Sequence, residues 1–277
     1  MSTPIQGFSK LSKEEKIDWV SQTFTQGDPE TKNLLTQYWH EDKALQKLHD
    51  EFIENTLSNF YVPLGIAPNF LINGKLYAIP MAIEESSVVA AAAKSASFWM
   101  ERGGFKAEVM GTQKIGHVHF MYTGDASALK DDFDVLEEDL RAATAELTSN
   151  MEARGGGITS IILVDATDRL DDYYQLEVTF ETCDSMGANF INSNLEEMAK
   201  CLQTFAQNHE RLDANALEVV MRILSNYTPN CLVRASVSCK IEELASEGVS
   251  AEEFARKFKR AIAIANAEPY RATTHNK

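Results

Sequence analysis

Apolar side chains recur at three- and four-residue spacing between residues 10 and 60, and this period predicts helices over KEEKIDWVSQTF and ALQKLHDEFIENTLSNF. The pattern then changes. NFLINGKLYAIP is typical of two strands joined at Asn73-Gly74, a pair that favours a tight hairpin turn. A long helix is predicted next, from Ser86 or Ser87 through VVAAAAKSASFWMER to Gly103-Gly104, because serine is a good N-cap and glycine commonly ends a helix.

The middle of the chain alternates between strand and helix patterns. The segments are, in order, the strand IGHVHFMY, the helix ASALKDDFDVLEEDLRAATAELTSNMEA, the strands GITSIILVDA and YYQLEVTFE, the helix NSNLEEMAKCLQTFAQNH and the strand LEVVMRILSN. This β-α-β-β-α-β order predicts a ferredoxin-like module. After it, RASVSCKIEEL predicts a strand, and SAEEFARKFKRAIAIANA predicts a helix that begins with a capping box between Ser250 and Glu253.

These elements predict an α+β protein, in which a mostly helical large domain carries an inserted ferredoxin-like small domain. We place the large domain at residues 1–109 and 219–277 and the small domain at residues 110–218. The chain has 277 residues, which is enough for two ordinary domains with a sizeable core.

Composition narrows the choice of function. The chain has 41 acidic and 26 basic side chains, a formal net charge of −15, which disfavours nucleic acid as a partner. The amino-terminal segment has no apolar core of a signal peptide, and the apolar run from Val88 to Ala93 is too short to cross a bilayer. Four cysteines without metal-site spacing indicate reduced thiols, so we expect a cytoplasmic protein that does not bind to membranes.

Two carboxylates stand directly before the alanine-rich helix, in PMAIEESSVVAAA. Glu84 and Glu85 either lie exposed and help the helix to begin, or one of them acts as a general acid. The alanines that follow favour the second interpretation, because they let a ligand approach closely, and they do not decide between the two glutamates.

A second candidate is the strand-to-helix turn in CDSMGANFINS. Asp184, Gly187 and Asn189 either form an ordinary turn, the usual role of a glycine there, or lie where free backbone N–H groups can receive a phosphate. The turn is not the G-x-G-x-x-G fingerprint of a Rossmann domain. The glycine run in ARGGGITS either lets a cofactor come close or is a flexible connection, and we favour the connection.

Two further groups are weaker signals. His117 and His119 lie on one face of a strand, but two histidines without a third ligand make a poor metal site, so no metal is predicted. At the carboxyl end, Arg271 suits a carboxylate or phosphate, and Lys277 can polarise a carbonyl oxygen.

Taken together and in order, these motifs resemble the bacterial, soluble class of 3-hydroxy-3-methylglutaryl-CoA (HMG-CoA) reductases. The resemblance rests on IENTLSNFYVPLGIAPNFLINGKLYAIPMAIEESSVVAAA, then GGG, DSMGANFIN, RILSN and EPYRATTHNK, and it extends from about Leu11. It implies an oxidoreductase that reduces HMG-CoA to mevalonate and coenzyme A with NADH or NADPH, or runs in reverse. It also implies a homodimer with shared active sites.

The resemblance assigns roles by motif. Glu85 matches the proton donor to the aldehyde oxygen, and Lys277 matches the lysine that stabilises negative charge on the carbonyl oxygen. Ser87 and Arg271 match positions that hold the HMG carboxylate, and Asn226 matches a residue near the substrate carbonyl. The nucleotide-binding turn corresponds to Asp184, Met186, Gly187, Ala188 and Asn189, and Glu54 and Asn55 fall in the segment that helps to form the dimer.

The chain also departs from the family. Ser58 replaces a family glycine, and LTSN at 147–150 lacks the acidic residue that some NADH-using relatives place before the glycine run, so NADPH is as plausible as NADH.

The family continues past the lysine with an asparagine, an aspartate and a flap with a histidine, none of which is in this sequence. We therefore expect these 277 residues alone to be nearly or wholly inactive, as the shortened form of a reductase. The alternative is a non-catalytic protein that truly ends at Lys277 and binds nucleotide or acyl-CoA, or dimerises.

Overall fold

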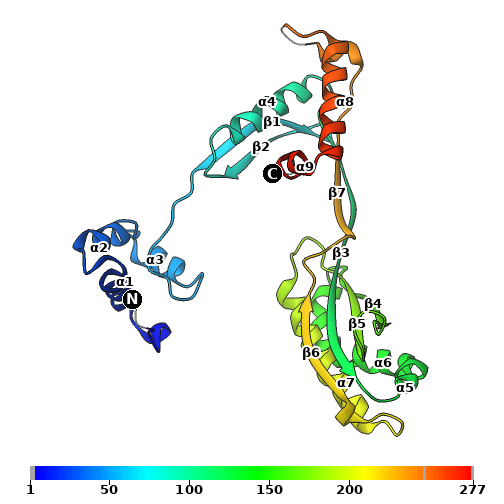
Figure 1. Ribbon diagram of the computed structural model, residues 1–277. Helices are drawn as coiled ribbons and strands as arrows, with labels where there is room; N and C mark the ends of the chain where they lie inside the picture. Colours follow the sequence, from blue (N-terminus) through cyan, green and yellow to red (C-terminus); the bar gives the residue numbers. More distant parts are fainter. Residues whose placement is uncertain (1–3, 246–247, 276–277) are drawn as a thin grey trace. The chain divides into compact units, whose positions relative to one another are not determined.

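The computed structural model describes residues 4–245 and 248–275. The chain divides into two compact units, Met1–Gly104 and Phe105–Lys277, and each unit is described by itself. Figure 1 shows the elements of both units in chain order. The three-segment domain assignment made from the sequence stays a prediction.

The first unit begins with short helices, namely η1 (Phe8–Lys10), α1 (Lys13–Thr25), α2 (Pro29–Thr36) and α3 (Lys43–Asp50). Ser12 and Glu15 form a capping box at the start of α1, and an aspartate side chain caps each of α2 and α3. The predicted helix over 44–60 is wrong after Asp50. Asn55 has a φ of 58°, and the Thr56 hydroxyl donates to the carbonyl oxygens of Asp50 and Ile53, so the chain turns there instead.

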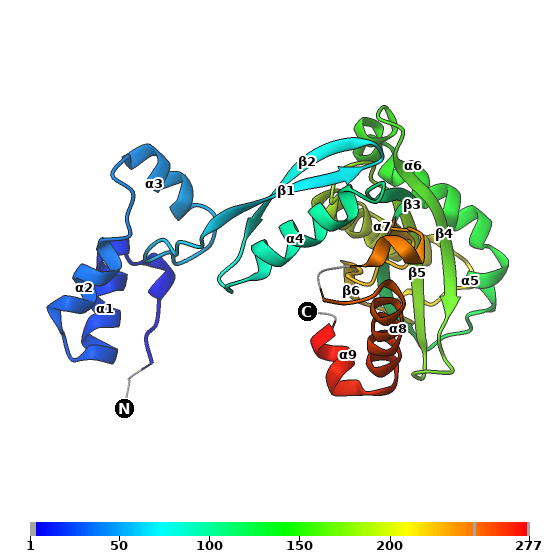
Figure 2. The same cartoon turned by 90° about the horizontal axis from the view of Figure 1, so that it is seen from above.

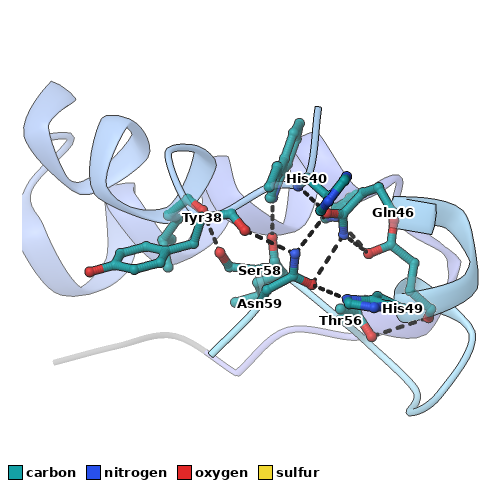
Figure 3. A network of polar contacts seen from close by, with 12 residues as sticks. Tyr38, His40, Gln46, His49, Thr56, Ser58 and Asn59 are labelled. Carbon is teal, nitrogen blue, oxygen red and sulfur yellow. Dashed lines mark hydrogen bonds and ion pairs between the residues drawn. The ribbon is translucent and has the colours of Figure 1, made fainter. Parts of the chain in front are cut away.

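A polar network holds the segment that follows α3 against the loop before it (Figure 3). The side-chain amides of Gln46 and Asn59 bond to each other, with Nδ2 of Asn59 at 2.8 Å from Oε1 of Gln46 and Nε2 of Gln46 at 3.3 Å from Oδ1 of Asn59. Asn59 also donates to the carbonyl oxygen of Tyr38 at 2.9 Å. Ser58 donates its hydroxyl to the carbonyl oxygen of Leu35, and this side chain therefore ties the segment to α2.

The hairpin is confirmed as β1 (Leu64–Ile72) and β2 (Lys75–Ala82), joined at Asn73 and Gly74 with positive φ angles of 48° and 81°. Helix α4 (Val88–Met100) packs along β1 (Figure 2). The helix begins as predicted after Ser87, but Ser87 itself has a φ of 72° and its side chain makes no capping hydrogen bond.

The second unit contains the predicted ferredoxin-like module. Its elements are β3 (Lys106–Tyr122), α5 (Ser127–Asp131), α6 (Phe133–Glu152), β4 (Gly157–Asp165), β5 (Tyr173–Glu181), α7 (Ala188–Asn208), η2 (Ala214–Ala216) and β6 (Leu217–Leu224). The sheet order β4-β5-β3-β6 is antiparallel throughout and confirms the β-α-β-β-α-β fold. The single helix predicted before β4 is two helices, which meet at Asp132.

The core of this module lies between the sheet and the helices α6 and α7, which pack against one of its faces (Figure 1). Alternate residues of β3 and β5 point into it, as the two-residue period of a strand requires. The fully buried members include Val118, Phe120, Leu176, Val178, Phe180, Leu136, Leu140, Leu195 and Leu202. Gly116 lets α7 approach, because a Cβ there would lie 2.6 Å from Cδ1 of Leu195.

Strand β3 starts earlier than predicted, at Lys106, because its first half pairs with β7 (Cys231–Ser236). The strand predicted over 234–244 ends at Ser236 and gives way to η3 (Ile241–Leu244). Helices α8 (Ala251–Ala267) and α9 (Pro269–His275) follow. Ser250 accepts from the Glu253 N–H as predicted, whereas the Glu253 carboxylate pairs with Lys257 at 2.7 Å.

Candidate functional site

The candidate nucleotide turn joins the end of β5 to the start of α7. Asp184, Met186 and Asn189 are exposed, and Ala188 is the first residue of the helix. Gly187 stands at the N-cap position with a φ of 75°, and no side chain caps α7. The first backbone N–H groups of a helix have no partner within the helix, so a long helix without a side-chain cap can receive an anion there.

Gly187 is required by packing as well as by conformation. A Cβ at this position would lie 2.5 Å from Cγ2 of Thr182, which is fully buried. The turn is also closed by two hydrogen bonds to the Thr182 carbonyl oxygen, from the N–H of Ser185 at 3.1 Å and from its hydroxyl at 2.8 Å. Residues 182–187 therefore have one compact conformation that other residues at position 187 would disturb.

The glycine run lies against this turn. Gly155 and Gly157 have φ angles of 89° and 120°, and a Cβ on Gly156 would lie 2.5 Å from the backbone oxygen of Glu181. The Cys183 thiol donates to the carbonyl oxygen of Arg154 at 3.4 Å. Gly156 thus allows a close approach between two backbone segments, and the interpretation of the glycine run as a flexible connection stays a prediction.

Asn226 lies at the same end of the module. It follows β6, whose last residue Leu224 donates its N–H to Oδ1 of Asn192 in the first turns of α7 at 3.0 Å. Strand β3 lies between β5 and β6 and shows that these two strands end close together. Its Gln113 pairs with Glu181 at the end of β5, and its Gly116 pairs with Leu224 at the end of β6. The tertiary structure therefore brings the nucleotide turn, the glycine run and the loop of Asn226 to the same end of the sheet.

The remaining predicted site residues lie elsewhere in the chain. Glu85 and Ser87 are exposed in the first unit, between β2 and α4. Arg271 is exposed in α9 of the second unit, and its backbone N–H donates to Glu268 at 2.6 Å. Lys277 lies outside the described residues. The roles assigned to these four residues stay predictions.

The histidine pair is engaged on the other face of the sheet. The rings of His117 and His119 stack with centroids 5.1 Å apart. Nδ1 of His119 lies 2.6 Å from the hydroxyl of Tyr173, and Nε2 of His117 lies 3.4 Å from Glu177. Within residues 4–245 and 248–275, no cluster of three or more His, Cys, Asp or Glu side chains is placed to hold a metal ion.

Burial, and then the neighbouring His117, lower the pKa of His119 below its ordinary value of 6.5. The unfolded chain therefore takes up this proton more readily than the folded chain, so the free energy of unfolding is expected to fall as the pH drops below about 6.5. His119→Gln should flatten this dependence. Urea unfolding of both proteins over this pH range measures the two slopes, and equal slopes would contradict the assignment.

Sequence reasoning missed three residues beneath the turn, namely Lys114, Glu181 and Thr182. Lys114 lies on β3 in register with Phe180, and its Nζ donates to the Thr182 hydroxyl at 2.7 Å. The sequence contained one sign of this contact. Lys114 is an even number of residues from Val118 and Phe120, so the two-residue period of a strand places it on the face that the core covers. A charged residue in that phase has to find a polar partner.

No helix of the described ranges combines the length and the apolar character needed to span a bilayer.

Comparison with known proteins agrees with the fold and the motifs. The family model for hydroxymethylglutaryl-coenzyme A reductase matches residues 12–277. The 3-hydroxy-3-methylglutaryl-coenzyme A reductase of Archaeoglobus fulgidus is 34% identical over 279 residues, which cover 100% of this chain and 59% of that protein. A probable reductase of Borreliella burgdorferi is 27% identical and is covered over 60% of its length. The chain thus spans about three fifths of the length of these curated relatives.

Solved structures agree as well. The class II 3-hydroxy-3-methylglutaryl-CoA reductase from Streptococcus pneumoniae bound to NADPH superposes with a TM-score of 0.69 at 28% identity, covering 99% of this chain and 70% of that one. A second structure of the reductase from Streptococcus pneumoniae gives a TM-score of 0.71 at 27% identity, covering 99% of this chain and 62% of that one. The fold class and the resemblance predicted from the sequence are therefore confirmed, and the chain belongs to the hydroxymethylglutaryl-coenzyme A reductase family.

Proposed function

We propose that this chain provides the nicotinamide-binding module and much of the catalytic machinery of an HMG-CoA reductase. The observation that carries the proposal is the family match over residues 12–277, a single span that contains Glu85, the nucleotide turn, Asn226 and Arg271. The reaction consumes HMG-CoA, two reduced nicotinamide cofactors and two protons. It yields mevalonate, coenzyme A and two oxidised cofactors, or runs in the opposite direction.

The proposed cofactor site lies at the end of the sheet where the nucleotide turn and the glycine run meet. The uncapped start of α7 and the closed turn before it suit the diphosphate of a dinucleotide. NADH and NADPH share that group. The NADPH-bound relative supports the phosphorylated cofactor, and both remain candidates for this chain.

The proposed chemistry uses the residues assigned by motif. Glu85 donates a proton to the aldehyde oxygen as hydride arrives, and Lys277 stabilises negative charge on the reacting oxygen. Arg271 and Ser87 hold the HMG carboxylate, for which the guanidinium fork of arginine is well suited. Asn226 lies near the substrate carbonyl.

We also propose a homodimer with shared active sites. Large apolar side chains are exposed around the segment of Glu54 and Asn55, including Phe52 at 69%, Phe60 at 89% and Leu64 at 73%. Exposed apolar residues gathered in one segment mark protein interfaces more often than free surface. The polar network between Gln46 and Asn59 closes the segment that carries Phe52.

Titration of the 277-residue chain with NADH and NADPH, followed by the fluorescence of the reduced nicotinamide, tests the cofactor site. We expect saturable binding of at least one of the two. Oxidation of the cofactor on addition of HMG-CoA, in a form of the protein that turns over, tests the reaction. Binding of cofactor without turnover in any form would favour the non-catalytic alternative, and no binding of either cofactor would overturn the proposal.

A further inference from the structure

The ammonium group of Lys114 contacts the nucleotide turn from the strand beneath it. Nζ of the half-buried Lys114 donates to the Thr182 hydroxyl at 2.7 Å and to the carbonyl oxygen of Thr112 at 3.3 Å. Strand β3 sets this position, because Lys114 is paired with Phe180, two residues before Thr182. The ammonium group therefore contacts the turn through the one side chain of the turn that is fully buried.

The contact with Lys114 sets the direction of a hydrogen-bond chain. A threonine hydroxyl has one proton to donate and can accept from other groups. Because Lys114 only donates, the Thr182 hydroxyl accepts from it and gives its own proton to the carbonyl oxygen of Ser185 at 2.8 Å. Ser185 is in turn bonded to the Thr182 carbonyl oxygen, and Gly187 packs on the Thr182 side chain. Lys114 thus acts on the residues that lead into α7.

Within the described ranges, none of the ion pairs includes Lys114. The nearest carboxylate along the turn, that of Glu181, is bonded instead to the N–H of Cys183 at 2.8 Å and to the Thr112 hydroxyl at 2.5 Å. The positive charge of Lys114 adds to the positive end of the α7 dipole. Such a local field can attract an anion even in a chain with a net charge of −15.

We propose that Lys114 is a positioning residue of the cofactor site, which holds the turn from Thr182 to Gly187 closed and strengthens binding of the dinucleotide diphosphate. The inference rests on the proposed function, because it assumes that a dinucleotide binds at the nucleotide turn. Lys114 holds the turn through its hydrogen bond to Thr182, and its positive charge attracts the diphosphate.

Lys114→Met in the full 277-residue chain is expected to raise the Kd for NADPH about 10-fold or more, the scale expected for losing a hydrogen bond from a charged group. Binding should also become less sensitive to salt, because a cation that attracts the diphosphate has been removed. Lys114→Arg, which keeps a charged donor, should restore much of both properties. Binding of adenosine, which has no phosphate, should change little.

Two further variants separate charge from structure. Lys130→Met removes one charge at the opposite end of the module, where Lys130 pairs with Asp165 at 2.6 Å, and should leave NADPH binding unchanged. Thr182→Val breaks the hydrogen-bond chain and keeps the charge, so it should weaken binding without altering its salt dependence. Circular dichroism and thermal unfolding check that each variant is folded.

The outcomes are distinguishable. A folded Lys114→Met variant with unchanged NADPH affinity would overturn this inference alone. Equal weakening of NADPH and adenosine, with salt dependence unchanged, would reduce Lys114 to a structural role and overturn the electrostatic part. Failure of the unsubstituted chain to bind any dinucleotide would overturn the proposed function and this inference with it.

Discussion

If the proposed reaction is right, replacing Glu85 with glutamine is expected to lower the turnover of an active form of this protein by about 10²–10⁴-fold, the usual contribution of a general acid. Glutamine has nearly the size of glutamate and can still donate a hydrogen bond, but it cannot give up a proton to the aldehyde oxygen. Substrate and cofactor affinities should change little, so the loss is expected in kcat. Oxidation of the reduced nicotinamide in the presence of HMG-CoA measures it.

Glu84 provides the matched control for this experiment. It is the adjacent residue, it is exposed like Glu85, and both precede α4. Glu84→Gln makes the same change in charge and should leave turnover within a few-fold of the unsubstituted protein. Equal loss from both variants would indicate a general effect of charge before the helix, and unchanged turnover in Glu85→Gln would refute its assignment as the proton donor.

Gly187→Ala is expected to destabilise the second unit and to abolish dinucleotide binding at accessible concentrations. An alanine at a φ of 75° costs about 1–2 kcal/mol more than glycine. Its Cβ would also lie 2.5 Å from Cγ2 and 2.9 Å from Cβ of the buried Thr182, and relieving this crowding costs about 1–3 kcal/mol more. Either the turn opens or the start of α7 moves. Denaturant unfolding and NADPH titration measure the two effects.

Gly155→Ala is the control that isolates the crowding. Gly155 also has a positive φ, 89°, but a Cβ there meets no atom within 4 Å. Gly155→Ala should therefore show only the conformational cost. If the two variants lose equal stability, the close packing of Gly187 on Thr182 contributes nothing.

Local pattern was sufficient where an element is decided by its own residues. The hairpin at Asn73-Gly74, the helix after Ser250 and the strand-helix order of the ferredoxin-like module all follow from period, turn chemistry and caps. Local pattern failed where a distant partner decides the conformation. The helix expected through residue 60 ends at Asp50, and the following segment bonds to Tyr38 and Leu35.

The candidate site divides in the same way. The sequence by itself determined the family, because five motifs in order need no knowledge of folding, and it predicted the residues of the turn. Only the tertiary structure decided that the turn, the glycine run and the loop of Asn226 lie at one end of the sheet. The pairing of Gln113 with β5 and of Gly116 with β6 places them there. The same pairing placed Lys114 under Thr182, a contact between residues 68 positions apart that no local period encodes.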